Sequence, residues 1–412
     1  MERYVNKNQK QLRMGITTGT CSAAAAKAAA SKLLLGVQKD SIRIDTPKKI
    51  AVEVAVELVE ESAKKVSCMV VKDSGDDPDV TNRAQIVVSV EKLTGKEQKE
   101  TLEEKAPEGG QYAADGIVSR YAFQSPEFPW LYLDGGVGVG RVTKKGLEQG
   151  VGQAAINTVP RQMIFAAVGE ICELAEYREP LLILVSVPKG EELAERTFNP
   201  RLGIVGGISI LGTSGILEPM SEKAIVDTIE AQIRQLAATG ETNLCVTPGN
   251  YGQEYASGYL HLDLGRSVKS SNYIGETLDL AVSYGMKNFL LVGNVGKLVK
   301  LAAGIMNTHS KTADGRCEIF AVHTVLCGGD RRMAQRIMAC INTEEMLELL
   351  DGWGLKDAVM ESICQKIGEN LQRRGGKSIR CSAVLFSEKY GYLGQTPGTD
   401  ALLREFELTK AD

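Results

Sequence analysis

The sequence of 412 residues has no excess of positive charge, no long apolar run and few aromatic side chains. Its formal net charge of −4 is opposite to the basic balance that nucleic-acid binding requires. No apolar stretch approaches the roughly 20 residues of a membrane-spanning helix. The polar segment 1–15 also lacks the apolar core of a signal peptide. We therefore expect a cytoplasmic protein that binds neither nucleic acid nor membrane.

Cysteine is present but follows no pattern. The nine cysteines are scattered and never spaced as CxxC, which argues against a disulfide framework and against a structural zinc site. Small buried side chains in a reducing compartment account for them. The sequence also lacks a Ser-His-Asp elbow, a Walker A loop and an HExxH motif. We expect neither a protein-bound metal nor a covalent nucleophile.

Length predicts two domains, with a boundary near Pro200. Residues 1–200 mix helices and strands without regular alternation, which predicts an α+β domain. Residues 201–412 alternate more regularly, which predicts an α/β domain with a Rossmann-like open sheet and helices on both faces. The strands expected in this second half are 203–211, 244–247, 289–292, 318–325 and 379–386.

The densest glycine segment runs from Asn199 to Ser221. Between a strand and a helix, such glycines let the backbone approach a nucleotide-like ligand. Tight turns and close strand packing are the alternative. The spacing is not GxGxxG, and Pro248-Gly249-Asn250, not an acid, follows the strand at 244–247, which disfavours a nicotinamide cofactor. The candidate ligand-binding residues are Gly203, Gly206, Gly207, Gly212, Thr213 and Ser214.

Two further glycine-bearing loops, 247–252 and 292–297, follow predicted strands of the same half. In an open parallel sheet, ligands lie outside the carboxyl ends of the strands. An ordinary turn explains either loop alone. Three such loops at one edge predict a ligand site to which Gly249, Asn250 and Gly293 contribute.

Four aspartates cluster between residues 73 and 79. Such a cluster suits a divalent cation, but Gly75 and Pro78 break the EF-hand pattern and no glutamate closes it. We therefore expect no metal there. Two interpretations stay open: a solvated loop built from Asx turns, or contact between Asp76, Asp77 and the polar groups of a ligand.

Basic side chains accompany glycines in segment 134–147. Backbone donors beside Arg141 and Lys144 suit a carboxylate or a phosphate. Arg13 and Arg161 lie in polar segments and are candidates to assist. A hairpin with solvated basic residues is the alternative.

Histidine is scarce, with three residues in the whole chain. His309 lies in the polar run 307–316 and is the candidate for acid–base work. The alternative is a helix-capping role. A preceding helix of about twelve residues, roughly 18 Å long, would carry His309 away from the ligand edge at 292–297.

Seven stretches, in order and over most of the chain, together resemble the cobalt-precorrin-5B C1-methyltransferase family of anaerobic cobalamin biosynthesis. One departure is Asn294, where that family's VGH-type loop is expected to carry histidine, so any mechanism that needs this histidine does not carry over. The stretches are LRMGITTGTCSAAAAKAA, VVKDSGDDPDV, DGGVGVGRVTKKGL, INTVPR, NPRLGIVGGISILGTSGILEPMS, TPGNYG and KLVKLAAGIMNTHSKTADGR.

The resemblance implies the reaction. S-adenosylmethionine would methylate carbon 1 of cobalt-precorrin-5B, a cobalt-containing tetrapyrrole, giving cobalt-precorrin-6A and S-adenosylhomocysteine. Because the sulfonium is already activated, the enzyme mainly positions and desolvates the reactants. The cobalt arrives inside the substrate, whose carboxylates would suit the arginines and lysine named above. The oligomeric state stays open.

Two other function classes are compatible with the residues alone. One is a non-catalytic carrier of a nucleotide or tetrapyrrole, and the other is a nicotinamide-dependent oxidoreductase. Binding of S-adenosylhomocysteine without binding of NAD would favour the methyltransferase over both.

Overall fold

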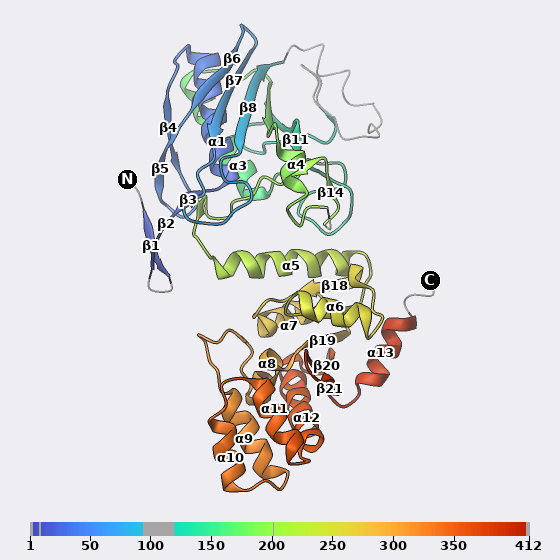
Figure 1. Ribbon diagram of the computed structural model, residues 1–412. Coiled ribbons are helices and arrows are strands. Elements are labelled where there is room, and N and C mark those ends of the chain that lie inside the picture. Colours follow the sequence, from blue (N-terminus) through green and yellow to red (C-terminus); the bar gives the residue numbers. More distant parts are fainter. Residues whose placement is uncertain (1–2, 8–9, 94–118, 201, 409–412) are drawn as a thin grey trace. The chain divides into compact units, whose positions relative to one another are not determined.

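The computed structural model describes residues 3–7, 10–93, 119–200 and 202–408. The chain forms two compact units, Met1–Ser221 and Glu222–Asp412 (Figure 1). Each unit contains both sheets and helices, so the mixed α/β character is confirmed. The division falls after Ser221 and not at the predicted residue 200, because short strand pairs join residues 204–217 to the first unit.

The first unit is built on a six-stranded sheet in the order β6-β7-β8-β13-β10-β9. Only β10 and β13 are parallel; the other neighbours are antiparallel. Two hairpins, β1-β2 and β4-β5, accompany it. The strands are β1 (Tyr4–Lys7), β2 (Lys10–Arg13), β4 (Ser41–Asp45), β5 (Ala51–Ala55), β6 (Glu57–Glu61), β7 (Lys65–Val71), β8 (Gln85–Lys92), β9 (Phe123–Gln124), β10 (Leu131–Gly135) and β13 (Leu181–Ser186).

Helix α1 (Thr18–Leu35) lies between this sheet and α3 (Thr158–Leu174). Its alanines are almost completely buried, and side chains this small let the sheet and α3 approach closely. The Thr17 side chain accepts a hydrogen bond from the Thr20 N–H, and Gly36 ends the helix with φ 71°. The helix therefore begins at Thr18, directly after its capping residue.

The glycine-rich segment forms short strands and not the single strand predicted at 203–211. These strands pair with others from earlier in the chain: β15 with β11, β14 with β12, and β16 with β3. The helix α4 (Gly190–Ala194) precedes them. The strands are β3 (Gly15–Ile16), β11 (Gly138–Val139), β12 (Arg141–Val142), β14 (Ile204–Val205), β15 (Gly207–Ile208) and β16 (Ile216–Leu217).

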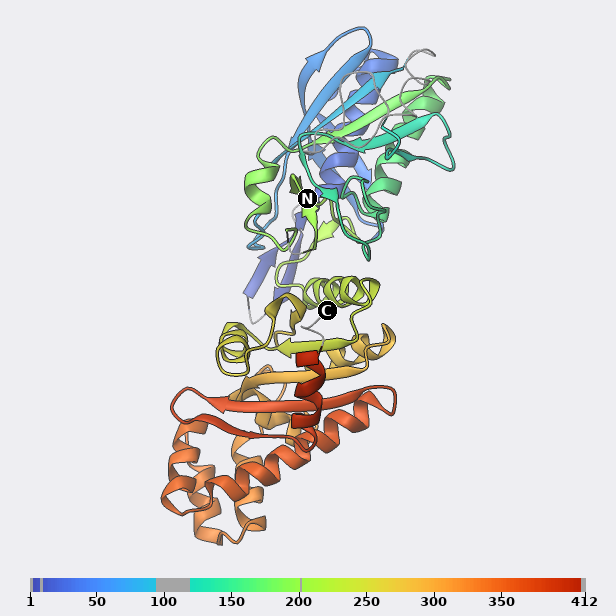
Figure 2. The ribbon, with the colours of Figure 1, turned by 90° about the vertical axis from the view of Figure 1, so that its right-hand side faces the viewer.

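The second unit contains a five-stranded sheet in the order β18-β17-β19-β20-β21 (Figure 2). The first four strands are parallel and the edge strand β21 is antiparallel. The central strands are buried along nearly their whole length, as expected of parallel strands covered on both faces. They are β17 (Asn243–Thr247), β18 (Ser267–Lys269), β19 (Asn288–Asn294), β20 (Arg380–Ser387) and β21 (Gly391–Gln395).

Helices cover both faces of this second sheet. Side chains of α5, α7 and α12 share one apolar cluster with Leu244, Phe289 and Leu385. Side chains of α6 and α13 share the opposite cluster with Cys245 and Leu290. These helices are α5 (Glu222–Ala238), α6 (Asn250–Gly258), α7 (Ile274–Ser283), α12 (Lys356–Gly375) and α13 (Thr399–Leu408).

One predicted strand of the second unit is wrong. Residues 318–325 lie within the helix α9 (Arg316–Leu326), whose buried side chains include Ile319, Phe320 and Ala321. A short apolar run is compatible with a buried helix as well as with a buried strand, so the pattern alone does not distinguish the two. The remaining helices are α8 (Val295–Leu298), α10 (Arg331–Met338) and α11 (Thr343–Gly352), with 3-10 turns at η1 (Leu264–Arg266) and η2 (Val299–Ala303).

Candidate functional site

Arg13 is bonded to the aspartate cluster of the first unit. The Arg13 guanidinium donates two hydrogen bonds to Asp73, at 2.5 and 2.8 Å, and these hold the pKa of the Asp73 carboxyl below its usual value. The backbone N–H of Arg13 donates to Asp76 at 2.6 Å. These three residues therefore join β2 to the loop after β7. A ligand contact at Arg13 or Asp76 stays a prediction, and it would compete with these bonds.

The other two aspartates of the cluster also have partners within the first unit. Asp77 accepts a hydrogen bond from the Met220 N–H at 3.0 Å, and burial raises the pKa of its carboxyl. Asp79 pairs with Lys72, whose side chain is almost fully buried. The loop thus fastens the end of the first unit, which gives its carboxylates a structural use without a ligand.

Arg141 is buried, with 4% of its surface exposed. Its guanidinium donates to Asp134 at 2.5 Å and to the carbonyl oxygen of Gly135 at 2.6 Å. Burial raises the pKa of Asp134, and the positive charge of Arg141 opposes that shift. This geometry counts against the predicted contact between Arg141 and a substrate carboxylate, because the ligand would have to replace Asp134.

Lys144 and Arg161 are more accessible than Arg141. Lys144 is exposed, and its aliphatic stem packs where a side chain on Gly203 would lie. Arg161 is partly exposed, stacks 4.2 Å from the centre of the Phe123 ring and donates to Thr158 at 2.7 Å. Burial lowers the pKa of Arg161. These two residues are the sterically available members of the predicted basic set.

Most glycines of segment 203–215 have a packing reason in the structure. A Cβ added at Gly207 would lie 2.1 Å from the Gly138 carbonyl oxygen, and one added at Gly212 would lie 2.2 Å from Thr17 Oγ1. Gly206, with φ 83°, differs because no atom lies within 4 Å of an added Cβ. Thr213 is exposed, whereas the Ser214 hydroxyl donates to the Ile216 carbonyl oxygen. Whether this segment also contacts a ligand stays a prediction.

The carboxyl ends of β17 and β19 lie side by side in the second unit. Gly249 precedes α6 with no side-chain cap on the helix, and nothing lies within 4 Å of a Cβ added there. Asn250 begins α6 and accepts a hydrogen bond from Lys269 at 2.6 Å. The sheet thus brings the two predicted loops, at Gly249 and Gly293, to one edge.

Two polar side chains at this edge were not predicted. The Thr247 hydroxyl, at the end of β17, is buried and has no hydrogen-bond partner among the described residues. Lys297, just after β19, is partly buried; burial and the nearby charge of Lys300 lower the pKa of its ammonium group. Asn294 caps α8 through a bond from the Gly296 N–H to its side chain. Thr247 and Lys297 both lie in the loops 247–252 and 292–297 that the sequence marked, but their burial could not be read from the spacing.

His309 is exposed in the loop between η2 and α9. Its Nδ1 accepts a hydrogen bond from the Lys311 backbone N–H at 3.1 Å, and the backbone N–H of His309 donates to Asn307 Oδ1. In the neutral ring this bond places the proton on Nε2. The Nε2–H is then placed to donate a hydrogen bond, whereas a protonated ring would lose the bond from Lys311.

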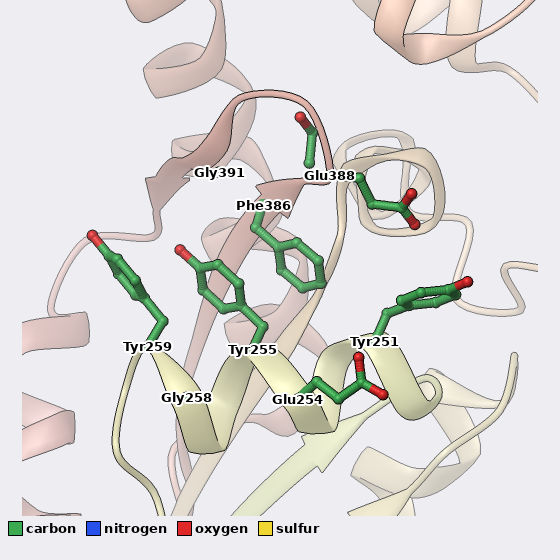
Figure 3. Close-up of a pocket in the computed structure, with 9 residues that line it drawn as sticks. Tyr251, Glu254, Tyr255, Gly258, Tyr259, Phe386, Glu388 and Gly391 are labelled. Carbon is green, nitrogen blue, oxygen red and sulfur yellow. The ribbon is translucent and has the colours of Figure 1, made fainter.

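The structure contains an aromatic groove that the sequence analysis did not predict (Figure 3). It has a volume of about 460 Å³ and lies between α6 and the β20–β21 turn. Tyrosines spaced four residues apart on α6 are a signal that could have found it in a chain poor in aromatic residues. The groove is lined by Tyr251, Glu254, Tyr255, Gly258, Tyr259, Phe386, Ser387, Glu388 and Gly391.

The predicted site residues lie in both units. The basic and acidic candidates and the glycine segment belong to the first unit, whereas Gly249, Asn250, Gly293 and His309 belong to the second. Within the described ranges, no group of three or more His, Cys, Asp or Glu side chains is arranged to hold a metal ion. In the same ranges, no helix is both long and apolar enough to cross a membrane.

Comparison with known proteins gave matches along nearly the whole chain. The cobalt-precorrin-5B C(1)-methyltransferase of Ruminiclostridium cellulolyticum is 45% identical over 94% of this chain and 92% of that protein. Its counterpart from Alkaliphilus metalliredigens is 38% identical over 98% of this chain and 97% of that protein. A crystal structure of the cobalamin biosynthesis protein CbiD from Archaeoglobus fulgidus is 25% identical, with a TM-score of 0.37, over 76% of this chain and 87% of that one.

Two family models also match. The model described as CbiD covers residues 5–219, and the model described as the CbiD C-terminal domain covers residues 307–397. The first match ends within two residues of the division between the two units after Ser221. On these matches, the chain belongs to the CbiD family.

Proposed function

We propose that this protein is the methyltransferase that transfers a methyl group from S-adenosylmethionine to carbon 1 of cobalt-precorrin-5B, giving cobalt-precorrin-6A in anaerobic cobalamin biosynthesis. The observation that carries the proposal is similarity over nearly the full length to curated proteins of that name, at up to 45% identity. Because both chains are covered almost completely, the similarity extends over both units of this chain. A cytoplasmic location stays a prediction.

We propose the second unit as a Rossmann-like donor domain. Numbered along the chain, its strands lie in the order 2-1-3-4-5, which is an order of doubly wound sheets. In such sheets the ligand binds outside the carboxyl ends, where the strand order reverses. Here that point lies between β17 and β19, and Gly249, Asn250 and Gly293 are the residues that would hold the donor.

The residues at this point fit a polar nucleoside ligand. The unpartnered Thr247 hydroxyl and the open space beside Gly249 leave polar groups and room at the end of β17. When bound, S-adenosylmethionine supplies a methyl group on a sulfonium that needs no further activation. The protein's own contribution is then to position the donor and to exclude water.

For the tetrapyrrole we propose Lys144 and Arg161 as carboxylate contacts. Both belong to the first unit and both are more exposed than the internally paired Arg141. Arg161 would exchange only a bond to the neutral Thr158 hydroxyl for a carboxylate, whereas Arg141 would have to give up the charged Asp134. Arg13, Asp76 and Asp77 stay predicted contacts that already have structural partners.

The test is turnover with purified protein, S-adenosylmethionine and cobalt-precorrin-5B. We expect S-adenosylhomocysteine and a corrinoid that has gained one methyl group at carbon 1, placed by NMR with a ¹³C-labelled donor. Binding of the corrinoid without release of S-adenosylhomocysteine would make the protein a carrier. Methylation at another carbon would contradict the proposed regiochemistry.

A further inference from the structure

The aromatic groove of the second unit contains a continuous row of stacked rings. Tyr255 lies flat against Phe386, with ring centres 4.2 Å apart and planes 3° apart. On its other side Tyr255 stacks on Tyr259 at 4.9 Å, and Tyr259 lies 6.3 Å from Tyr392. Figure 3 shows Tyr255 and Tyr259 extending from α6 beside Phe386, with Tyr251 further along the helix.

The outer rings of the groove are open to solvent, whereas Phe386 is 4% exposed and Tyr255 is half-buried. Tyr251 is 64% exposed and Tyr259 is 58% exposed, although the chain has few aromatic residues to place anywhere. The groove's volume of about 460 Å³ falls in the range of roughly 300–1,000 Å³ that is usual for small-molecule sites. The size suits a nucleoside better than a whole tetrapyrrole.

The negative charge of the groove favours some classes of small ligand over others. Glu254 and Glu388 line it, and its lining includes no lysine, arginine or histidine. The faces of aromatic rings also carry a partial negative charge, so they attract cations. A ligand rich in carboxylates is therefore disfavoured here, whereas a ligand with a positive centre and a flat ring is favoured.

The groove contains one buried polar atom that has no hydrogen-bond partner among the described residues, the hydroxyl oxygen of Tyr255. Burial raises the pKa of Tyr255 to about 12, so the hydroxyl stays protonated and able to donate at neutral pH. A heterocyclic nitrogen or a ribose hydroxyl would satisfy it.

We propose that this groove binds the adenosyl sulfonium of the methyl donor, with the adenine stacked on the tyrosine row and the sulfonium near Glu254 or Glu388. The inference rests on the proposed methyltransferase function and adds a site to it. Tyr251 directly follows Asn250, so the groove continues along α6 from the loop already proposed to hold the donor. An adenosyl group with a cationic sulfur combines the flat ring and the positive charge that the lining favours.

The test uses calorimetric titration of the full chain with S-adenosylmethionine and with S-adenosylhomocysteine. We expect Tyr259→Ala to raise the Kd of both ligands about tenfold, because a stacking face is lost. Glu388→Gln should weaken S-adenosylmethionine more than S-adenosylhomocysteine, because only the former carries the positive sulfur. Tyr4→Ala in the first unit and Glu361→Gln on α12 are the matched controls, and both should leave the two affinities unchanged.

The outcomes separate this inference from the function itself. Wild-type protein that binds S-adenosylmethionine, together with correctly folded groove variants of unchanged affinity, would overturn the groove as the donor site and leave the function standing. Groove variants that change only the oligomeric state, by light scattering, would make the groove an interface between copies and also overturn it. Wild-type protein with neither donor binding nor turnover would remove the proposed function and this inference together. Far-UV circular dichroism verifies the fold of each variant.

Discussion

At the scale of single residues, some of the charged side chains predicted to bind a ligand are buried and others are exposed. Arg141 faces inward and pairs with Asp134, whereas Lys144, three residues later, is exposed. Nothing in the spacing of the segment distinguishes the two, because both follow glycines in the same short run. The direction of a side chain in a glycine-rich turn depends on how the turn packs, and here β12 turns Arg141 into the unit.

Arg141→Met should therefore impair the fold before it impairs binding. The change leaves the buried Asp134 carboxylate without its counter-charge, which costs about 3–5 kcal/mol of stability. Urea unfolding measures this loss. Lys144→Met, an exposed change of similar size, should alter stability by only about 0.5 kcal/mol. A stable Arg141→Met protein with a raised KM for the tetrapyrrole would restore Arg141 as a substrate contact.

The Arg13–Asp73 pair should give a pH-dependent contribution to stability. Because the folded pKa of Asp73 is lowered, its contribution is present above the ordinary carboxyl pKa of about 3.9 and disappears as the pH falls through the folded value. Asp73→Asn should thus lower stability at pH 7 by about 1 kcal/mol or less, since the pair is partly exposed. The difference from wild type should shrink in melts recorded below pH 4. A difference that is constant with pH would exclude the charge as its cause.

His309 stays our candidate for acid–base or orienting work. His309→Ala should then slow the chemical step about 10²- to 10⁴-fold, with little change in Tm because the ring is exposed. Single-turnover rates measured beside thermal melts make the comparison. A lower Tm with nearly normal turnover would instead assign the ring to its local turn with Lys311.

At the scale of elements, the hydrophobic pattern located three of the five strands predicted in the second half of the chain, at 244–247, 289–292 and 379–386. The predicted strand at 289–292, for example, is the core of β19. The pattern could not predict which strands pair. The strand predicted in the glycine segment was wrong for another reason. The strands found there are two residues long and pair with partners more than sixty residues away. Such short strands have no periodicity to detect, and their glycines are required by the close approach of β15 to β11.

Gly206 allows a clean test of the glycine segment as a donor contact. Gly206 and Gly240 have nearly equal φ values of 83° and 84°, and neither has an atom within 4 Å of an added Cβ. Alanine at either position should cost a similar strain of about 1–2 kcal/mol. We expect only Gly206→Ala to weaken S-adenosylhomocysteine binding. Equal affinity in the two variants would remove the segment from the donor site.

At the scale of the whole molecule, the chain has two units, and the proposed donor residues belong mainly to the second. The first unit uses its acidic loop to fasten its own end, through Asp77 and Met220. Because the loop has this structural role, we expect no catalytic metal in it. The proposed chemistry requires none from the protein, because the cobalt is part of the substrate.

Activity should accordingly survive exhaustive treatment of enzyme and buffers with EDTA. The aspartates of the loop accept hydrogen bonds from Arg13 and from the Met220 N–H or pair with Lys72, so these carboxylates have partners without a metal. Turnover before and after chelation is the measurement. Loss of activity that Mg²⁺ or Ca²⁺ restores would show a metal requirement and contradict this account.

The sequence by itself determined the family, the mixed α/β character and the three glycine-bearing segments, because these depend on local composition and on the order of motifs along the chain. Only the tertiary structure decided which candidates share a surface. It buried Arg141, assigned segment 204–217 to the first unit and aligned Tyr255 with Phe386, which lies more than a hundred residues further along the chain. Contacts between distant residues depend on strand order and helix packing, and no local pattern encodes them.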